Sequence, residues 1–188
     1  MPSCERFRAN WFGEHVASYQ NAIKKQARVV LVGDSIVANL SRYPAVWARL
    51  EGLKAANCGI RGDRTLNVLW RVERMHLPAT TSVGIIHCGI NDIRGSCSSA
   101  FDSEEIAGNL ISCGSKLQDR NPLMSIIIIG ILPTEAAFQG EGARITAVNQ
   151  ALQKMCQNFK HFSYVDTNDL FVDSTTKGIL WSNNRFFL

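Results

Sequence analysis

The chain has 188 residues, of which 46% are hydrophobic and 19% charged, and its formal net charge is +4. This length predicts a single domain that can bury a core without disulfide bonds. No apolar run is long enough to cross a membrane, and the first residues lack the apolar centre of a secretory signal. We therefore expect no membrane span and an intracellular, cytoplasmic protein.

The cysteines and the basic residues indicate whether a metal, a cofactor or a nucleic acid is an expected ligand. The six cysteines include no Cys-x-x-Cys pair and no cluster with metal-ligand spacing, so we expect buried reduced thiols, no metal and no cofactor. Four arginines could line one side of a helix and meet a phosphate backbone: Arg61, Arg64, Arg71 and Arg74. A solvated helix face with ordinary ion pairs is the favoured interpretation. Because the basic excess is mild, nucleic-acid binding by this domain alone is not expected.

Short apolar runs alternate with segments of helical spacing along the first half of the chain. The run 29–33 is continuously apolar and ends in a turn signal, which is typical of a strand buried on both faces. The predicted elements are, in order, a helix over 14–26, the strand 29–33, helical residues to about 50 with a break near Tyr43-Pro44, a strand over 53–57 and a helix over 65–74.

The second half continues the alternation. Its predicted elements are a strand over 82–88, a helix over 104–118 capped by Asp102 or Ser103, a strand over 124–132, a flexible loop over 140–142, a helix over 143–158 and a strand over 162–165. Strands that alternate with helices of this length predict βαβ units. With right-handed crossovers the fold class is α/β, a three-layer α/β/α domain with a five-stranded parallel sheet.

Three polar loops follow the first three predicted strands: 33–35, 59–63 and 89–92. Because parallel strands share a direction, these loops meet at one edge of the sheet, where α/β proteins bind ligands. Ser35 offers a nucleophile, a glycine brings a bare backbone N–H close to a substrate, and Asn91 offers an amide donor. Together they predict an oxyanion-hole arrangement for acyl transfer. The alternative is that Asp34 or Ser35 simply caps the next helix.

These loops resemble the sequence blocks of the SGNH (GDSL-like) hydrolases, an esterase superfamily with a flavodoxin-like fold. Gly33-Asp34-Ser35-Ile36 resembles the first block, 57–63 the second and 89–92 the third. The longer match over 57–71 is similar to the catalytic subunits of intracellular platelet-activating-factor acetylhydrolases. It is similar also to the esterase domain of LINE-type retrotransposon first-open-reading-frame proteins. The first loop lacks the Gly-x-Gly-x-x-Gly spacing of a dinucleotide site.

The resemblance implies a role for each motif residue. Ser35 would be the nucleophile, and its N–H, the N–H of Gly62 and the side chain of Asn91 would hold the oxyanion. Three further motif residues would have structural roles, with the glycine permitting the loop turn: Asp34, Gly59 and Asp92. The substrate would be a small acyl ester or an acetylated compound, and a homodimer is compatible with the resemblance.

One block of the family pattern is absent. The family carries an Asp-x-x-His near its C-terminus, whose histidine activates the serine, and residues 171–188 contain no histidine. The general base is therefore unknown, with His87 as a weak candidate whose strand position favours a structural role. We divide the chain into an N-terminal helical segment (1–26), an SGNH hydrolase-like domain (27–172) and a divergent or truncated tail (173–188) that lacks the final helix.

Two functions remain open from the sequence. The first is a serine ester hydrolase whose activity is impaired by loss of the catalytic Asp and His, because a serine hydroxyl without a base is a poor nucleophile. The alternative is a catalytically inactive SGNH-like binding or interaction domain, derived from a truncated hydrolase or a retrotransposon.

Overall fold

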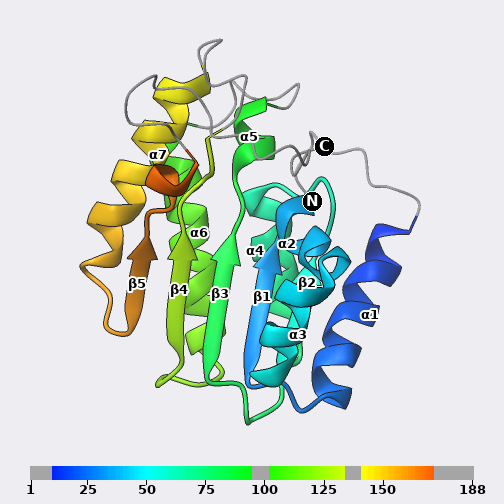
Figure 1. Ribbon diagram of the computed structural model, residues 1–188. Coiled ribbons are helices and arrows are strands. Elements are labelled where there is room, and N and C mark those ends of the chain that lie inside the picture. The colour runs from blue at the N-terminus through cyan, green and yellow to red at the C-terminus, as the bar shows by residue number, and fades with distance from the viewer. Residues whose placement is uncertain (1–9, 95–101, 134–140, 172–188) are drawn as a thin grey trace.

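The computed structural model describes residues 10–94, 102–133 and 141–171. Its five strands form one parallel sheet in the order β2-β1-β3-β4-β5 (Figure 1). This confirms the predicted α/β fold class and the five-stranded parallel sheet. The strands are β1 (Val29–Gly33), β2 (Ala55–Gly59), β3 (Val83–His87), β4 (Ser125–Ile129) and β5 (Phe162–Val165).

Helices lie on both faces of the sheet, which gives three layers (Figure 1). One face is covered by α1 (Trp11–Lys24), α4 (Thr65–Arg74), α6 (Ser103–Gln118) and α7 (Glu141–Cys156). The main core lies under these helices and includes alternate residues of the strands, such as Val30, Val32, Ile126 and Ile128. On the other face, α2 (Ser35–Asn39), the 3₁₀ turn η1 (Leu40–Arg42) and α3 (Pro44–Gly52) cover β1 and β2.

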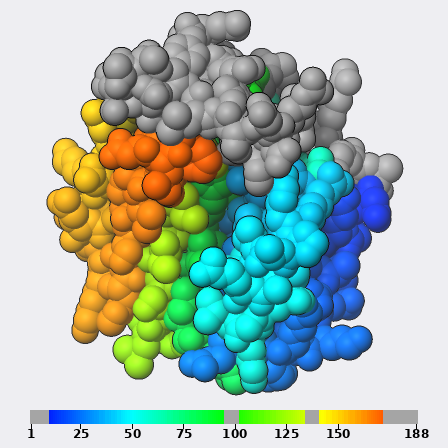
Figure 2. Space-filling model, viewed as in Figure 1, coloured from blue at the N-terminus to red at the C-terminus, as the bar shows by residue number. Residues whose placement is uncertain are grey.

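The second face is only partly covered within the described residues. No described helix lies over this face of β4 and β5, and Figure 2 shows strand atoms at the surface between α3 and β5. Val165 on β5 is 40% exposed, whereas every residue of β1 is buried. The predicted absence of a final helix falls on residues outside the described ranges, as does the predicted tail, and the domain boundaries stay predictions.

Several element boundaries differ from those expected. The helix α1 begins three residues earlier than predicted, at Trp11, and α7 begins at Glu141 within the stretch that was expected to be a loop. The strand β2 begins two residues later than predicted because Leu53 caps α3 and is exposed, and Lys54 turns the chain with a φ of 56°. The strand β4 is shorter than the apolar run that predicted it.

Two short elements were not predicted. The helix α5 (Ile90–Arg94) follows β3, where the sequence had suggested a loop, and its first turn closes with the amide of Asp92 donating to the carbonyl of Gly89 at 3.1 Å. The 3₁₀ turn η3 (Asn168–Leu170) follows β5. None of the described helices is long and apolar enough to span a bilayer.

Side-chain burial confirms one expectation and corrects another. Four cysteines are free and buried: Cys58, Cys88, Cys113 and Cys156. The other two, Cys4 and Cys97, lie outside the described residues. The four arginines do not share a solvated helix face, because Arg71 is completely buried. Both interpretations of that arginine row placed Arg71 at the surface, and both are wrong for this residue.

Candidate active site

The strand order changes direction at the carboxyl ends of β1 and β3. From β1 the chain crosses to β2 on one side, and β3 then lies on the other side of β1. Adjacent loops diverge at such a switch point, which is where open α/β sheets bind ligands. Ser35 follows β1 and Asn91 follows β3, so the two residues that carry the predicted chemistry lie on either side of the switch point.

Ser35 is the first residue of α2, and the residue before it caps that helix. The carboxylate of Asp34 accepts a hydrogen bond of 2.9 Å from the amide of Ile36, which is the usual geometry of an aspartate N-cap. The preceding Gly33 allows β3 to come close, because a Cβ there would lie 2.0 Å from the carbonyl oxygen of His87. Asp34 thus caps α2, and the Ser35 side chain is partly exposed.

The second loop is fixed to the end of β1 at its start. The amide of Ile60 donates to the carbonyl of Gly33 at 2.9 Å. Gly59 permits close packing of β2 on α2, since a Cβ there would lie 2.3 Å from the backbone nitrogen of Ala38. Gly62 is exposed and has a φ of 81°, a conformation that L side chains rarely adopt. The glycine required by the turn is thus Gly62, whereas Gly59 serves a close approach.

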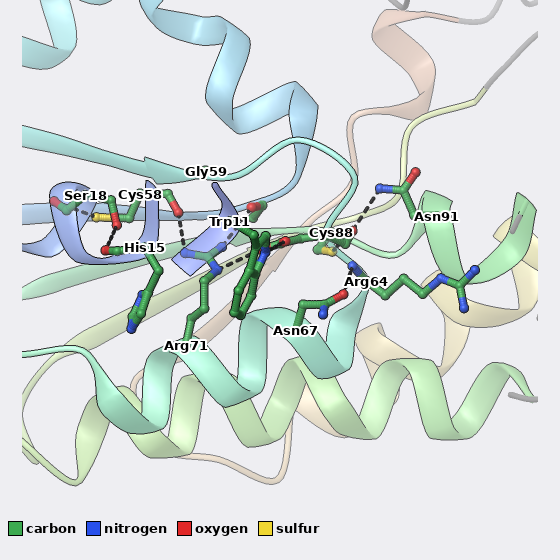
Figure 3. Close-up of polar contacts among 12 residues, drawn as sticks. Trp11, His15, Ser18, Cys58, Gly59, Arg64, Asn67, Arg71, Cys88 and Asn91 are labelled. Atoms are coloured by element: carbon green, nitrogen blue, oxygen red, sulfur yellow. Dashed lines mark hydrogen bonds and ion pairs between the residues drawn. The ribbon is translucent and has the colours of Figure 1, made fainter. Parts of the chain in front are cut away.

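The helix α5, which stands where the third loop was expected, is joined to the second loop through Asn91. Its Nδ2 donates a hydrogen bond of 2.8 Å to the backbone carbonyl of Asp63, directly after Gly62 (Figure 3). An amide nitrogen carries two hydrogens, so the second remains available as a donor. The neighbouring Asp92 is buried, and its carboxylate accepts from both the amide and the hydroxyl of Thr65, at 3.0 and 2.8 Å. Asp92 therefore fixes α5 against the start of α4.

A buried polar network lies beneath these loops, and sequence reasoning missed it. The Nε of Arg71 donates to Asp63 Oδ2 at 2.7 Å, and its terminal nitrogens donate to the carbonyls of Cys58 and Gly33 at 2.8 and 3.1 Å. The Nε1 of Trp11 donates to the other oxygen of the Asp63 carboxylate at 2.6 Å (Figure 3). One guanidinium thus binds the ends of β1 and β2 and the loop after Gly62.

A signal for Arg71 is present in the sequence. Val68, Arg71 and Val72 recur at the spacing of one helix face, and both valines are completely buried. An arginine within an apolar stripe of this kind is a candidate for a buried ion pair. No comparable signal exists for Trp11, because it lies 52 residues from its partner Asp63.

Burial dominates the titration of the acidic groups around the site. It raises the pKa of Asp34 to about 6, with the hydrogen bond from the Ile36 amide opposing the rise. Burial likewise raises the pKa of Asp92 to about 6, opposed by the hydrogen bonds from Thr65. The pKa of Asp63 is also raised by burial, and the guanidinium of Arg71 opposes that rise. These carboxyls are engaged in holding the loops.

The only histidine at this edge of the sheet is His87, the last residue of β3. It is 4% exposed, its Nδ1 lies 3.4 Å from the carbonyl oxygen of Ile129, and burial lowers its pKa to about 4. The other three histidines lie on α1, after α4 and before β5: His15, His76 and His161. The His87 side chain therefore contacts the backbone of β4, and none of these contacts is with Ser35.

Comparisons with known proteins agree with this architecture. The sequence profile described as the GDSL-like Lipase/Acylhydrolase family matches residues 31–184. The platelet-activating factor acetylhydrolase IB subunit alpha2 of Homo sapiens is 29% identical over 166 residues, which is 87% of this chain and 69% of that protein.

Two solved structures have the same fold. A GDSL-like lipase from Bacteroides thetaiotaomicron superposes with a TM-score of 0.71 at 18% identity, over 89% of this chain and 83% of that chain. A putative platelet activating factor structure from Streptococcus pneumonia gives a TM-score of 0.66 at 21% identity, over 89% and 82% of the two chains. The similarity to retrotransposon esterase domains stays a prediction. From the profile match, which covers most of the sequence, the chain belongs to the GDSL-like lipase/acylhydrolase family.

Proposed function

We propose that this protein is a serine acyl-ester hydrolase in which Ser35 is the nucleophile and turnover is impaired. The observation that carries the proposal is the hydrogen bond from Asn91 Nδ2 to the Asp63 carbonyl. It fixes an amide donor beside the loop that contains Gly62, at the same edge of the sheet as Ser35. A nucleophile opposite fixed N–H donors is the arrangement that stabilises the tetrahedral intermediate of acyl transfer.

In the proposed reaction, Ser35 Oγ forms a bond to the ester carbonyl carbon. The carbonyl oxygen becomes an oxyanion held by the N–H groups of Ser35 and Gly62 and by the Asn91 amide. The carbon–oxygen bond to the alcohol then breaks, the alcohol leaves with the serine proton, and water hydrolyses the acyl-enzyme to a free acid. Turnover is slow because the only histidine near this edge has a pKa of about 4 and contacts Ile129, so it is a weak base for Ser35.

The test is hydrolysis of p-nitrophenyl acetate by the wild-type protein, Ser35→Ala and Ser41→Ala. Ser41 is an exposed hydroxyl on η1 and serves as the matched control. We expect a slow rate that Ser35→Ala lowers and Ser41→Ala preserves. The acceleration that an oxyanion hole provides without a nucleophile, on the order of 10³–10⁴ over water, should remain in Ser35→Ala.

Covalent labelling by a fluorophosphonate gives a second readout that does not need turnover. We expect one labelled site, at Ser35, in the wild-type protein and in Ser41→Ala. If neither labelling nor hydrolysis depends on Ser35, the hydrolase proposal fails, and the inactive binding domain becomes the better description. If both are fast, the proposed impairment is wrong, and His87→Gln then tests whether that imidazole acts as the base.

The substrate, assembly and location are proposals of the same kind. A small acyl ester or acetylated compound is proposed because the curated relatives are named acetylhydrolases. These relatives are also named as subunits, which supports a homodimer, to be measured by light scattering after size-exclusion chromatography. An intracellular, cytoplasmic location is proposed as well, and microscopy of a fluorescent fusion tests it.

A further inference from the structure

We propose that Arg61 makes this site prefer esters that carry a negatively charged group beside the scissile bond. The inference rests on the proposed function, since it names the substrate class of the same site. The shared chemistry is an anion, a carboxylate or a phosphate, within reach of the Arg61 guanidinium in the second loop.

The position of Arg61 is set by two elements of the site. It lies in the second loop, between Ile60, which is bonded to the end of β1, and Gly62. A terminal guanidinium nitrogen of Arg61 donates to Oδ1 of Asn39, the last residue of α2. Asn39 follows Ser35 by four residues, and residues at this spacing share a helix face. Asn39, which the guanidinium contacts, is therefore one helical turn from Ser35, a rise of about 6 Å along α2.

The charge of Arg61 is not matched by a carboxylate among the described residues. Its hydrogen-bond partner is a neutral amide oxygen. Arg71 and Arg94, by comparison, form ion pairs with Asp63 and Glu141 at 2.7 and 2.6 Å. Arg61 is also partly buried, which strengthens its attraction for an anion relative to a fully exposed side chain.

Arg64, on the same loop, is directed elsewhere. Figure 3 shows its side chain extending away from the Arg71–Asp63 cluster, and its positive charge lies near Asp92. Arg61 is thus the arginine of this loop that is anchored against α2. A guanidinium has five N–H donors, and the bond to Asn39 uses one, so the others can bind a carboxylate or phosphate in the bidentate manner.

Matched pairs of anionic and neutral esters measure the preference. They also show whether the charge must lie on the acyl side or on the alcohol side of the scissile bond. Acyl-side charge is tested with p-nitrophenyl hydrogen succinate against its neutral methyl ester. Alcohol-side charge is tested with 4-acetoxybenzoate against methyl 4-acetoxybenzoate. For at least one pair we expect the ratio of kcat/KM, anionic over neutral, to fall roughly fivefold or more in Arg61→Gln.

Two further variants separate a local charge effect from a general one. Asn39→Asp places a carboxylate against the guanidinium, and we expect it to lower the same ratio although Arg61 is still present. Arg28→Gln removes an exposed positive charge at the opposite edge of the sheet and should leave the ratio unchanged. A ratio that Arg28→Gln lowers as much as Arg61→Gln does would overturn the inference in favour of overall charge.

A binding measurement keeps this inference separate from the catalytic proposal. In Ser35→Ala, which cannot form an acyl-enzyme, NMR titration compares 4-acetoxybenzoate and monoethyl succinate with their neutral methyl and ethyl esters. We expect one anion to bind roughly fivefold more tightly than its neutral partner, and Arg61→Gln in the same background to remove the difference. If anion and neutral ester bind equally, the inference is wrong even where hydrolysis is observed. If the anion binds preferentially but the wild type hydrolyses nothing, the proposed function alone fails.

Discussion

The carboxylate of Asp63 accepts hydrogen bonds from two side chains on different helices, Arg71 at 2.7 Å and Trp11 at 2.6 Å, and both groups of the Arg71–Asp63 ion pair are shielded from solvent. The backbone carbonyl of the same aspartate accepts from Asn91. A single residue thus joins α1, α4 and α5 at the point that follows Gly62. The geometry of the proposed oxyanion hole therefore depends on an ion pair that does not face the substrate.

Removing the cation of this pair should be costly. Arg71→Met leaves Asp63 buried without a counter-charge, and breaking a buried pair from one side destabilises by about 3–5 kcal/mol. We expect a loss of this size in the free energy of unfolding, measured in urea at pH 7. Because burial already raises the pKa of Asp63, its carboxyl is more easily protonated in the folded variant at low pH. The loss should therefore be smaller at pH 4.

Arg74→Met, one turn away on the same helix, is the matched control for Arg71. The Arg74 guanidinium lies 4.3 Å from the ring centroid of Trp70 and pairs with Glu73 at the surface. Its removal should cost no more than about 1 kcal/mol. Equal losses in the two variants would show that the buried pair has no special importance for the fold.

Gly62 should resist substitution for a reason of backbone geometry. Both Gly62 and Gly108 have open space where a Cβ would be placed, but only Gly62 has a positive φ, of 81°. Gly62→Ala should destabilise by about 1 kcal/mol and slow the labelling of Ser35, because the loop must leave its left-handed conformation. Gly108→Ala, within α6, should stabilise by about 1 kcal/mol. Thermal unfolding of the two variants gives the comparison, and a stabilised Gly62→Ala would contradict it.

Asn91 should matter for the reaction of Ser35 more than for stability. Losing one oxyanion-hole donor typically lowers the rate about 10²-fold or more, so we expect Asn91→Ala to slow fluorophosphonate labelling by roughly that factor. Asn109→Ala is the matched control, since Asn109 also donates a single side-chain hydrogen bond, to Thr65 at 3.2 Å. If both variants react like the wild type, Asn91 does not hold the oxyanion.

The sequence predicted the sheet well because strands and helices differ in their hydrophobic period. The bounds of β1, α4 and β5 are as expected. The start of β2 was misplaced because Leu53 continues the apolar pattern while the backbone is still turning. The helix α5 has only five residues, which is too short for a periodic signal.

The same contrast applies to the site. Glycine-containing loops after successive strands were enough to bring Ser35, Gly62 and Asn91 to one edge. The supporting ion pair was not predicted, because Trp11 and Asp63 are distant in sequence and an arginine is usually assigned to the surface. Local pattern thus predicts which groups come to this edge of the sheet, but tertiary contacts determine what holds them there.

The pH dependence of stability should carry the signature of His87. Burial lowers its pKa from 6.5 to about 4, so between these pH values the unfolded chain binds a proton that the folded chain does not. His87 therefore reduces stability as the pH falls, by about 2 kcal/mol between pH 7 and 4.5. Asp34 and Asp92 act in the opposite sense, because their raised pKa values favour the folded state at low pH. The wild-type curve is the sum of these contributions, so a variant is needed to separate them.

The variant His87→Gln removes the contribution of His87 to the pH dependence of stability and keeps the opposite contributions of Asp34 and Asp92. Relative to wild type, we expect this variant to lose about 2 kcal/mol less stability between pH 7 and pH 4.5, measured by urea unfolding at both values. His76→Gln, at an exposed imidazole after α4, is the control for replacing a histidine by glutamine. Parallel curves for wild type and His87→Gln would mean that His87 is protonated in the folded protein. That outcome would return His87 to consideration as a group that exchanges protons at the Ser35 edge of the sheet.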